Sequence, residues 1–318
     1  MGVPLEAERS FQPFEPDPVN IGVGKQKLRI LCIAFQQCIF ILRQNFVKGV
    51  YKLKKVLTIA GSDSCGGAGI QADLKTMSAL GVYGMSVITA ITAQNTVGVK
   101  KSMDVDSDMI EAQIKAIFDD IKVDAVKIGM VSNSNSIEVI KKLLIKYKAS
   151  NIVLDPVMVS KSGYHLLKVK AEESLKQLVE IADLVTPNIP EAEVLAKMKI
   201  KNEDDMKEAA KRIEALGAKN VLVKGGHRLN DANDILLTGN YFIKVKGKRI
   251  DTKNTHGTGC TLSSAIASFL SRGLSISEAV RFSKEYITKA IENSFSIGNG
   301  VGPVGHFVEL YKSAGIKF

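Results

Sequence analysis

Residues 254–263 read Asn-Thr-His-Gly-Thr-Gly-Cys-Thr-Leu-Ser, and this stretch decides the fold. Gly257 and Gly259 allow a tight backbone turn, and the apolar-periodic run Leu262–Leu270 predicts a helix directly after it. The first amides of a helix lack intrahelical partners and carry the positive end of the helix dipole, so they bind anions. The sequence therefore predicts a glycine-lined anion site at the start of a helix.

Three side chains in the same stretch could take part in chemistry. Thr258 and Thr261 contribute hydroxyl groups, and Cys260 places a thiol in the first helical turn. A thiol at a helix start ionises more easily than a free one, so we expect a lowered pKa and favour a catalytic role for Cys260. The alternative is a small residue that only packs there. Our interpretation is that this loop holds a phosphoryl group during transfer.

The length of 318 residues fits one large α/β domain or two small ones. The net charge is +10, but residues 1–55 carry nine Lys/Arg and four Asp/Glu, which leaves 10 − 5 = +5 for the remainder. Basic residues such as Lys207 and Lys211 alternate with acidic ones, so we expect no nucleic-acid partner. The four cysteines have no zinc-finger or CxxC spacing, which indicates a reduced, cytoplasmic protein.

The N-terminal residues do not conform to this pattern. We expect residues 1–53 to be an extension, disordered or non-native, and residues 54–318 to be the folded domain. The apolar run Leu28–Leu42 is interrupted by Arg29 and by Gln36, and it is shorter than the about 20 apolar residues that span a membrane. We therefore expect no membrane association.

From Val56 to Val223 short apolar runs alternate with helical patterns, which predicts a mostly parallel sheet covered by helices on both faces. The runs Ile235–Thr238 and Tyr241–Val245, joined by Gly239-Asn240, predict a small β-hairpin. The predicted class is therefore α/β.

Polar or glycine-rich residues follow almost every predicted strand, at the edge where open α/β sheets bind ligands. Each of them alone has a plainer explanation: a tight turn for Gly61–Gly69, helix stabilisation for Asp73, a turn for Gln94, a loop cap for Asp155 and a helix cap for Asn188. Their coincidence at one edge favours a site. In chain order these residues are Gly61, Asp73, Gln94, Met130, Asp155, Asn188, Glu191 and Lys224.

Seven segments in this order resemble the hydroxymethylpyrimidine/phosphomethylpyrimidine kinases of thiamine biosynthesis, which have the ribokinase-like fold. The resemblance covers about residues 54–307. The segments are Ala60–Asp73, Ala93–Thr96, Lys127–Met130, Leu154–Met158, Thr186–Glu191, Val223–His227 and His256–Thr261.

The resemblance implies a role for each candidate residue. Gly61, Asp73, Gln94 and Met130 would bind the aminopyrimidine, and Glu191 and Asp155 would organise Mg²⁺ and its waters with help from Asn188. Lys224, Thr258 and Asn188 would bind ATP, and the catalytic group would comprise Cys260, Gly257, Gly259 and Lys224. Many ribokinase relatives have Asp where this chain has Cys260, whereas the pyrimidine kinases share the cysteine.

The resemblance implies an Mg·ATP-dependent kinase that phosphorylates 4-amino-5-hydroxymethyl-2-methylpyrimidine and then its monophosphate. We expect a homo-oligomer, most simply a dimer. Two alternatives stay open at this point: a pyridoxal kinase on the same fold, and a non-catalytic pyrimidine-binding regulator. An NAD-dependent dehydrogenase is disfavoured because the G-x-G-x-x-G order is absent from Gly61–Gly69.

Overall fold

The computed structural model describes residues 52–158, 169–226 and 232–316. They belong to a unit that runs from Leu53 to Phe318. The expected extension over residues 1–53 lies outside the described residues, apart from its last two positions. Among the described residues no helix is long and apolar enough to cross a membrane.

The strands form one nine-stranded sheet in the order β3-β2-β1-β4-β5-β6-β7-β8-β9. The six strands from β2 to β7 in this order pair in parallel, while β3, β8 and β9 add antiparallel edges. Strand bounds are β1 Lys55–Asp63, β2 Tyr83–Gln94, β3 Val99–Asp104, β4 Ala125–Ile128, β5 Ile152–Leu154, β6 Leu184–Val185, β7 Asn220–Val223, β8 Asp234–Thr238 and β9 Tyr241–Val245.

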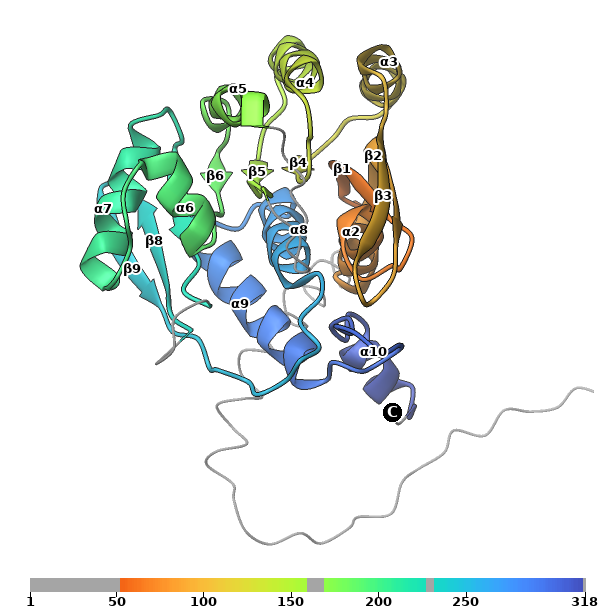
Figure 1. The fold of residues 1–318 in the computed structure, drawn as a ribbon. Coiled ribbons are helices and arrows are strands. Elements are labelled where there is room, and N and C mark those ends of the chain that lie inside the picture. The colour runs from red at the N-terminus through yellow and green to blue at the C-terminus, as the bar shows by residue number, and fades with distance from the viewer. Residues whose placement is uncertain (1–51, 159–168, 227–231, 317–318) are drawn as a thin grey trace, which may run out of the picture. The chain divides into compact units, whose positions relative to one another are not determined.

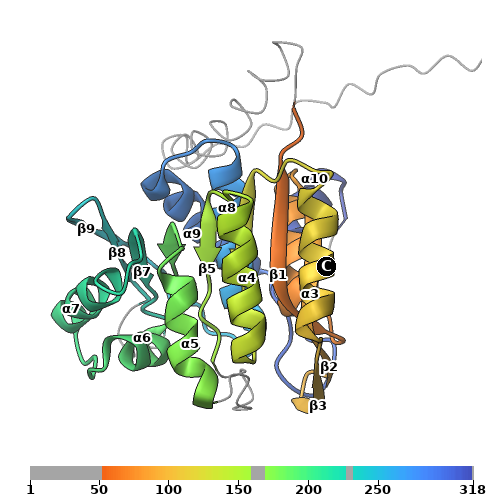
Figure 2. The same ribbon diagram turned by 90° about the horizontal axis from the view of Figure 1, so that it is seen from above.

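Helices cover both faces of the sheet, with α3, α4 and α5 on one side and α2, α8 and α9 on the other (Figures 1 and 2). Because both faces are covered, the central strands are mostly apolar, as in β5 with Ile152–Leu154, although β4 carries the buried Lys127. Helix bounds are α2 Gly69–Ala79, α3 Ser107–Phe118, α4 Ser134–Lys146, α5 Val169–Val179, α6 Ile189–Ala196, α7 Glu203–Glu214, α8 Thr258–Ser271, α9 Ile276–Glu292 and α10 Val308–Ser313.

Helix α8 is the central helix of its layer, and every residue from Thr261 to Ser271 is buried. A helix surrounded in this way must satisfy its polar side chains internally. Ser264 donates to Asp73, and Ser268 donates to the Ser264 carbonyl. Helix α8 is therefore fixed by packing and hydrogen bonds around its circumference. Its first residues belong to the glycine-containing loop of residues 254–260, which we call the anion loop.

The structure confirms the parallel sheet, the helices on both faces and the β8–β9 hairpin. Gly239 and Asn240 join the two hairpin strands with φ of 51° and 67°, the left-handed pair that a type I′ turn requires. Strand β3 was not predicted, because its sequence Val-Lys-Lys-Ser-Met-Asp is largely exposed and polar. It forms because β2 offers an unpaired edge, on which it lies antiparallel.

Candidate active site

The anion loop contacts the glycine turn Gly61–Gly69, which begins at the end of β1. Gly257 caps α8 with a φ of 81°, and a Cβ at this position would lie 1.8 Å from the Gly67 carbonyl oxygen. A Cβ on Gly67 would in turn lie 2.3 Å from the His256 ring. The two backbones therefore touch without intervening side chains, which only glycine at both positions permits. Two segments far apart in sequence thus form one wall.

The start of α8 also faces the ends of β5 and β7. A Cβ on Gly259 would lie 3.3 Å from Asp155 Oδ2 and 3.5 Å from Lys224 Nζ. The Thr258 hydroxyl donates to the Thr255 carbonyl at 2.8 Å and closes the turn. The structure therefore brings Gly259 close to Asp155 and Lys224 at the start of α8, where Gly257 is the N-cap residue. The Thr258 amide donates to the Thr255 carbonyl at 3.3 Å.

Lys224 is held by an ion pair with Asp155. Its Nζ donates to Asp155 Oδ1 at 2.8 Å, and only 13% of the lysine side chain and 2% of the aspartate side chain is exposed. Burial alone would lower the pKa of Lys224, but the carboxylates of Asp155 and Glu191 raise it. The ammonium therefore stays charged, poised to bind a phosphate oxygen.

Asn188 and Glu191 form a capping box at the start of α6. The Glu191 amide donates to Asn188 Oδ1 at 2.9 Å, and the Asn188 amide donates to Glu191 Oε2 at 2.8 Å. The helix-cap alternative is thus real for both residues. Burial raises the pKa of Glu191 to about 7, with Asp155 adding to the rise and Lys224 opposing it. A carboxylate in this state gains from a cation beside it.

The expected lowering of the Cys260 pKa is wrong. Cys260 lies in the first turn of α8, but burial of its thiol raises the pKa to about 11, and the carboxylates of Asp73 and Asp155 add to the rise. Lys127 and a hydrogen bond from the Gly69 backbone act to lower this pKa, yet desolvation outweighs them. Part of the residue's surface remains accessible. The group beside the anion loop is therefore a neutral thiol at physiological pH.

A second cluster lies at the ends of β1, β2 and β4. Gly61 sits at a bulge in β1, and a Cβ there would lie 2.5 Å from Met130 Cε. The Met130 carbonyl accepts a hydrogen bond from Thr89 on β2. Gln94 ends β2, and its backbone exchanges two hydrogen bonds with the Ser64 hydroxyl at 2.8 and 2.9 Å. Gly61, Met130 and Gln94 thus come from neighbouring strand ends.

Asp73 is not an open ligand in this structure, which corrects the expectation of direct pyrimidine contact. Its side chain has no exposed surface. One carboxylate oxygen accepts from Thr58 at 2.6 Å and from Lys127 at 2.9 Å, and the other accepts from Ser264 at 2.6 Å. The carboxylate is used to hold protein groups. It remains close enough to Cys260 to affect the thiol's pKa.

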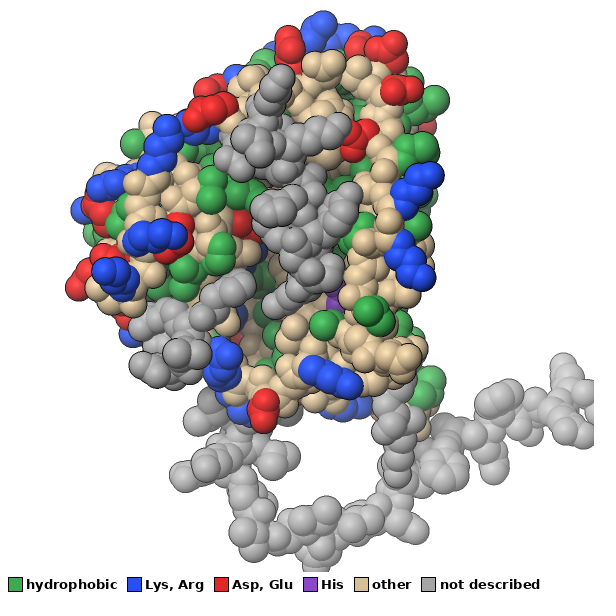
Figure 3. Space-filling view, viewed as in Figure 1, with side chains coloured by type: hydrophobic (Ala, Val, Ile, Leu, Met, Phe, Trp, Pro, Cys, Tyr) green, Lys and Arg blue, Asp and Glu red, His purple; other side chains and the backbone are tan. Residues whose placement is uncertain are grey.

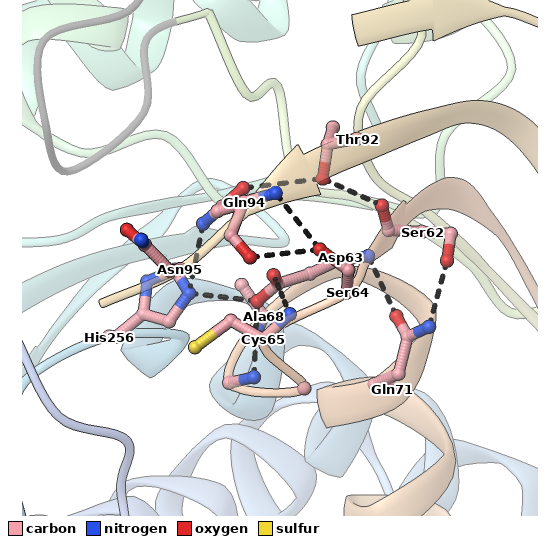
Figure 4. Close-up of polar contacts among 12 residues, drawn as sticks. Ser62, Asp63, Ser64, Cys65, Ala68, Gln71, Thr92, Gln94, Asn95 and His256 are labelled. Atoms are coloured by element: carbon pink, nitrogen blue, oxygen red, sulfur yellow. Dashed lines mark hydrogen bonds and ion pairs between the residues drawn. The ribbon is translucent and has the colours of Figure 1, made fainter. Parts of the chain in front are cut away.

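Two functional candidates that sequence reasoning missed are Asp63 and His256 (Figure 4). Asp63 accepts hydrogen bonds from the amides of Cys65, Gly67 and Ala68, so it shapes the glycine turn. His256 Nε2 lies 2.8 Å from Asp63 Oδ2 and 3.1 Å from Gln94 Nε2. The sequence could have indicated both residues, because Asp63 lies within Gly61–Gly69 and His256 lies within residues 254–263.

The glycines near the C-terminus have a clear role. A Cβ on Gly300 would lie 2.0 Å from the Thr96 carbonyl oxygen, and the Gly300 amide donates to the Thr96 hydroxyl at 3.1 Å. The Val301 amide donates to the Thr96 carbonyl at 2.8 Å. The tail therefore crosses directly over the end of β2, next to Gln94. The sequence showed these glycines but gave no partner for them.

The charge on the face seen in Figure 3 is mixed, with Lys and Arg side chains interspersed among Asp and Glu around the rim. Such a surface lacks the single-sign stripe that tracks a polyanion. Two further ammonium groups are buried and paired with carboxylates, Lys224 with Asp155 and Lys127 with Asp73.

The carboxylates near the anion loop fit an Mg²⁺ ion that takes most of its other ligands from phosphates and water. No group of three or more His, Cys, Asp or Glu side chains among the described residues could cage a metal. Mg²⁺ usually keeps several waters and takes one or two carboxylates together with substrate phosphates. Asp155 and Glu191 are two such carboxylates, and Asp155 lies close enough to raise the pKa of Glu191.

Comparison with known proteins agrees with this geometry. The phosphomethylpyrimidine kinase family model matches residues 63–305. The chain is 51% identical over 255 residues to the thiamine biosynthesis bifunctional protein ThiED of Geobacter sulfurreducens, covering 80% of this chain and 52% of that protein.

Two further similarities cover nearly the whole of the matched protein. The chain is 47% identical over 252 residues to the hydroxymethylpyrimidine/phosphomethylpyrimidine kinase of Streptomyces coelicolor, covering 79% of this chain and 93% of that one. The ADP complex of Bacillus subtilis pyridoxal kinase superposes with a TM-score of 0.75 at 42% identity, covering 80% of this chain and 98% of that one.

Proposed function

The chain belongs to the phosphomethylpyrimidine kinase family, and we propose that it carries out two successive phosphoryl transfers from Mg·ATP. The first acceptor is the hydroxymethyl group of 4-amino-5-hydroxymethyl-2-methylpyrimidine, and the second is the monophosphate so formed. Both steps would take place at the site between the α8 start and the ends of β1, β2 and β4, and both serve thiamine biosynthesis.

One observation carries this proposal: the anion loop and the glycine turn share a backbone contact. The Gly257–Gly67 approach of 1.8 Å, measured from a built Cβ to the carbonyl oxygen, leaves the α8 amides next to the turn that begins at Gly61. A phosphate bound on the amides and a ring bound near Gly61 and Gln94 would therefore be neighbours. Phosphoryl transfer depends chiefly on such positioning.

At the phosphate end, each residue has a part that follows from its contacts. The helix-start amides of Gly257–Cys260 would bind the transferring group, and the Lys224 ammonium would neutralise charge on the nucleotide. Asp155, Glu191 and Asn188 would hold Mg²⁺ through its waters, and Thr258 would line the loop. Bound Mg²⁺ would supply charge neutralisation between the phosphates.

At the acceptor end, Gln94 would pair with the amino group and a ring nitrogen of the pyrimidine, since an amide offers both a donor and an acceptor. Met130 would pack on the ring beside Gly61. In the first step the substrate oxygen bonds to phosphorus, the bond to ADP breaks, and the hydroxyl proton is released. The neutral Cys260 thiol would position that hydroxyl, because its raised pKa disfavours a thiolate at rest.

The second step needs no such proton removal. A phosphate monoester is largely ionised at neutral pH, so its oxygen attacks directly. A site that stabilises charge through amides and Lys224 serves both acceptors, whereas a site built around one strong base would serve only the alcohol. The raised pKa of the Cys260 thiol is compatible with the first kind of site.

We further propose a homodimer in the cytoplasm. Exposed apolar side chains gather on the β2–β3 edge of the sheet, where Ile91, Val97 and Met103 are 47%, 66% and 58% exposed. A sheet edge that exposes apolar side chains among polar ones is a natural contact surface between copies. Light scattering tests the dimer: a monomer at all accessible concentrations would contradict it.

The experiment that tests the proposed function is a substrate panel with Mg·ATP. The pyrimidine alcohol, its monophosphate, pyridoxal and ribose are compared by ADP release and by mass of the product. We expect both pyrimidines to be the preferred acceptors. Preference for pyridoxal would identify a different vitamin kinase, and nucleotide binding without transfer to any acceptor would indicate a regulator.

A further inference from the structure

Lys127 is a fully buried ammonium that the two phosphoryl transfers do not use directly. It lies on β4 with no exposed surface and is the largest side chain with this property among the described residues. A Cβ on Gly129 would lie 2.6 Å from its Nζ, so the strand end is left open for the lysine by a glycine. Such a charge needs a partner to be tolerated.

The partner is Asp73, and the pair joins four elements. Lys127 Nζ on β4 lies 2.9 Å from Asp73 Oδ2 on α2, which also accepts from Thr58 on β1 at 2.6 Å. Asp73 Oδ1 accepts from Ser264 on α8 at 2.6 Å. One carboxylate therefore ties two central strands to the helix that carries the anion loop.

The pair lies below the reacting end of α8. Cys260 precedes Ser264 by four residues, so the two side chains share one face of the helix. Burial alone would lower the pKa of Lys127, but the carboxylates of Asp73 and Asp155 raise it, and Lys127 in turn opposes the rise in the pKa of Cys260. The lysine therefore remains charged beneath the site.

Core stability alone does not account for this arrangement. A buried ion pair is weak evidence for stability, because well-packed apolar residues of similar volume often replace it without loss. Two apolar residues at positions 73 and 127 would fill the same space. What they would not supply is the hydrogen bond to Ser264 or a positive charge facing the first turn of α8.

We propose that Lys127 is a positioning residue for phosphoryl transfer: through Asp73 and Ser264 it fixes the first turns of α8, and with them the amides that bind the transferring group. The pair acts as a buried brace between the sheet and the anion loop. This inference rests on the proposed function, since it concerns the residues proposed to hold the phosphoryl group.

The test is a cycle of Lys127→Met, Asp73→Asn and the double variant, with the urea midpoint, kcat and the KM of the pyrimidine alcohol measured for each. Either single change leaves one buried charge unpaired and lowers the midpoint. The double variant removes both buried charges, but its asparagine replaces the charge-assisted hydrogen bond from Ser264 with a weaker neutral one and leaves the side chain without its lysine partner. We expect its midpoint to return towards that of the unaltered chain.

The double variant's kcat decides the matter. A loosened anion loop should leave kcat at least about tenfold low, because small misplacements are costly in positioning. KM for the pyrimidine should change little, whereas loss of a direct pyrimidine contact at Asp73 would raise it. Recovery of both midpoint and kcat in the double variant would overturn the proposal, as would a change confined to KM.

Ser264→Ala is a second test of the brace, and it leaves no buried charge unpaired. It removes only the hydroxyl that ties α8 to Asp73, so the Lys127–Asp73 pair stays intact. We expect a lower kcat with KM nearly unchanged, and an unchanged kcat would contradict the brace. Lys219→Met is the matched control, since it breaks a Lys–Asp pair of 2.7 Å with Asp183 at the opposite end of the strands. It should leave kcat unchanged.

The outcome also separates this inference from the proposed function. If the unaltered chain fails to phosphorylate the pyrimidine, the proposed function fails and the inference fails with it. If the unaltered chain is active and the double variant is equally active, only the inference fails.

Discussion

His256 Nε2 lies 2.8 Å from Asp63 Oδ2, and this contact joins two turns that are 193 positions apart in the chain. The same nitrogen lies 3.1 Å from the Gln94 amide nitrogen (Figure 4). Burial alone would raise the pKa of Asp63, but hydrogen bonds from His256 and the Ala68 amide hold it below its usual value. Asp63 is therefore a carboxylate at neutral pH, and His256 Nε2, which donates to it, ties it to the anion loop beside Gln94.

His256→Ala should impair both substrate sites together. Loss of a hydrogen bond to a charged group costs about 1.5–3 kcal/mol, so kcat/KM for the pyrimidine should fall by at least about tenfold. Steady-state kinetics against both substrates measures this effect. Asp251→Asn, an exposed change earlier in the same segment, is the control and should leave kinetics unaltered. Normal kinetics in His256→Ala would show that glycine packing alone aligns the loops.

Gln94→Ala should weaken pyrimidine binding and spare nucleotide binding. Gln94 lies at the end of β2, away from Lys224 and the β7 end, and its loss removes one or two hydrogen bonds to the ring. We expect the dissociation constant of the pyrimidine to rise about tenfold. Calorimetry with each ligand separates the two sites. A variant that loses affinity for ATP but keeps its affinity for the pyrimidine would refute the assignment.

Cys260→Ala should slow the first phosphorylation more than the second. The alcohol must lose a proton during transfer and the ionised monophosphate does not, so any help from the thiol applies to the first step alone. With a pKa of about 11, the thiol should also react slowly with iodoacetamide at pH 7 and faster as pH rises towards 11. Quenched-flow analysis of both steps checks the first point. Equal slowing of the two steps would mean that Cys260 only shapes the loop.

Glu191→Gln should remove a pH dependence of stability. The folded-state pKa of about 7 exceeds the usual value of 4.5, so the protonated form is favoured on folding. This contribution is fully present below pH 4.5 and is lost as pH rises through 7, amounting to roughly 3 kcal/mol in the free energy of unfolding. Urea unfolding of the ligand-free chain from pH 5 to 8 measures it.

Mg·ATP should reverse this trend, because a cation favours the ionised carboxylate. Affinity for Mg·ATP should therefore rise with pH through about 7 in the unaltered chain and stay flat in Glu191→Gln. A slope that persists in the variant would place the titrating group elsewhere.

The architecture was predictable because it follows from periodicity. Fully apolar runs such as Ile152–Leu154 indicate strands buried on both faces, and Gly239-Asn240 indicates its own turn type. Strand β3 was missed because its exposed, polar sequence carries no such signal, and its pairing depends on the free edge of β2. An edge strand is specified by its neighbour rather than by its own sequence.

The sequence predicted which residues lie near one another at the candidate site better than it predicted what each residue does there. Strand ends placed Gln94, Lys224 and Glu191 at one edge of the sheet. Position in a helix start indicated a lowered pKa for Cys260, but the degree of burial, which is a property of the whole fold, decided the opposite. Asp73 was seen as a polar residue near a ligand, and only the distances to Lys127 and Ser264 show it as a structural partner.

The central claim is that the anion loop presents a nucleotide's terminal phosphate to a pyrimidine bound at the ends of β1 and β2. A crystal structure of the chain with the pyrimidine alcohol and a non-hydrolysable ATP analogue tests it most directly. The account predicts the ring beside Gly61 and Gln94, with its hydroxyl in line with a terminal phosphate held by the Gly257–Cys260 amides. A ring bound elsewhere, or a terminal phosphate remote from those amides, would contradict it.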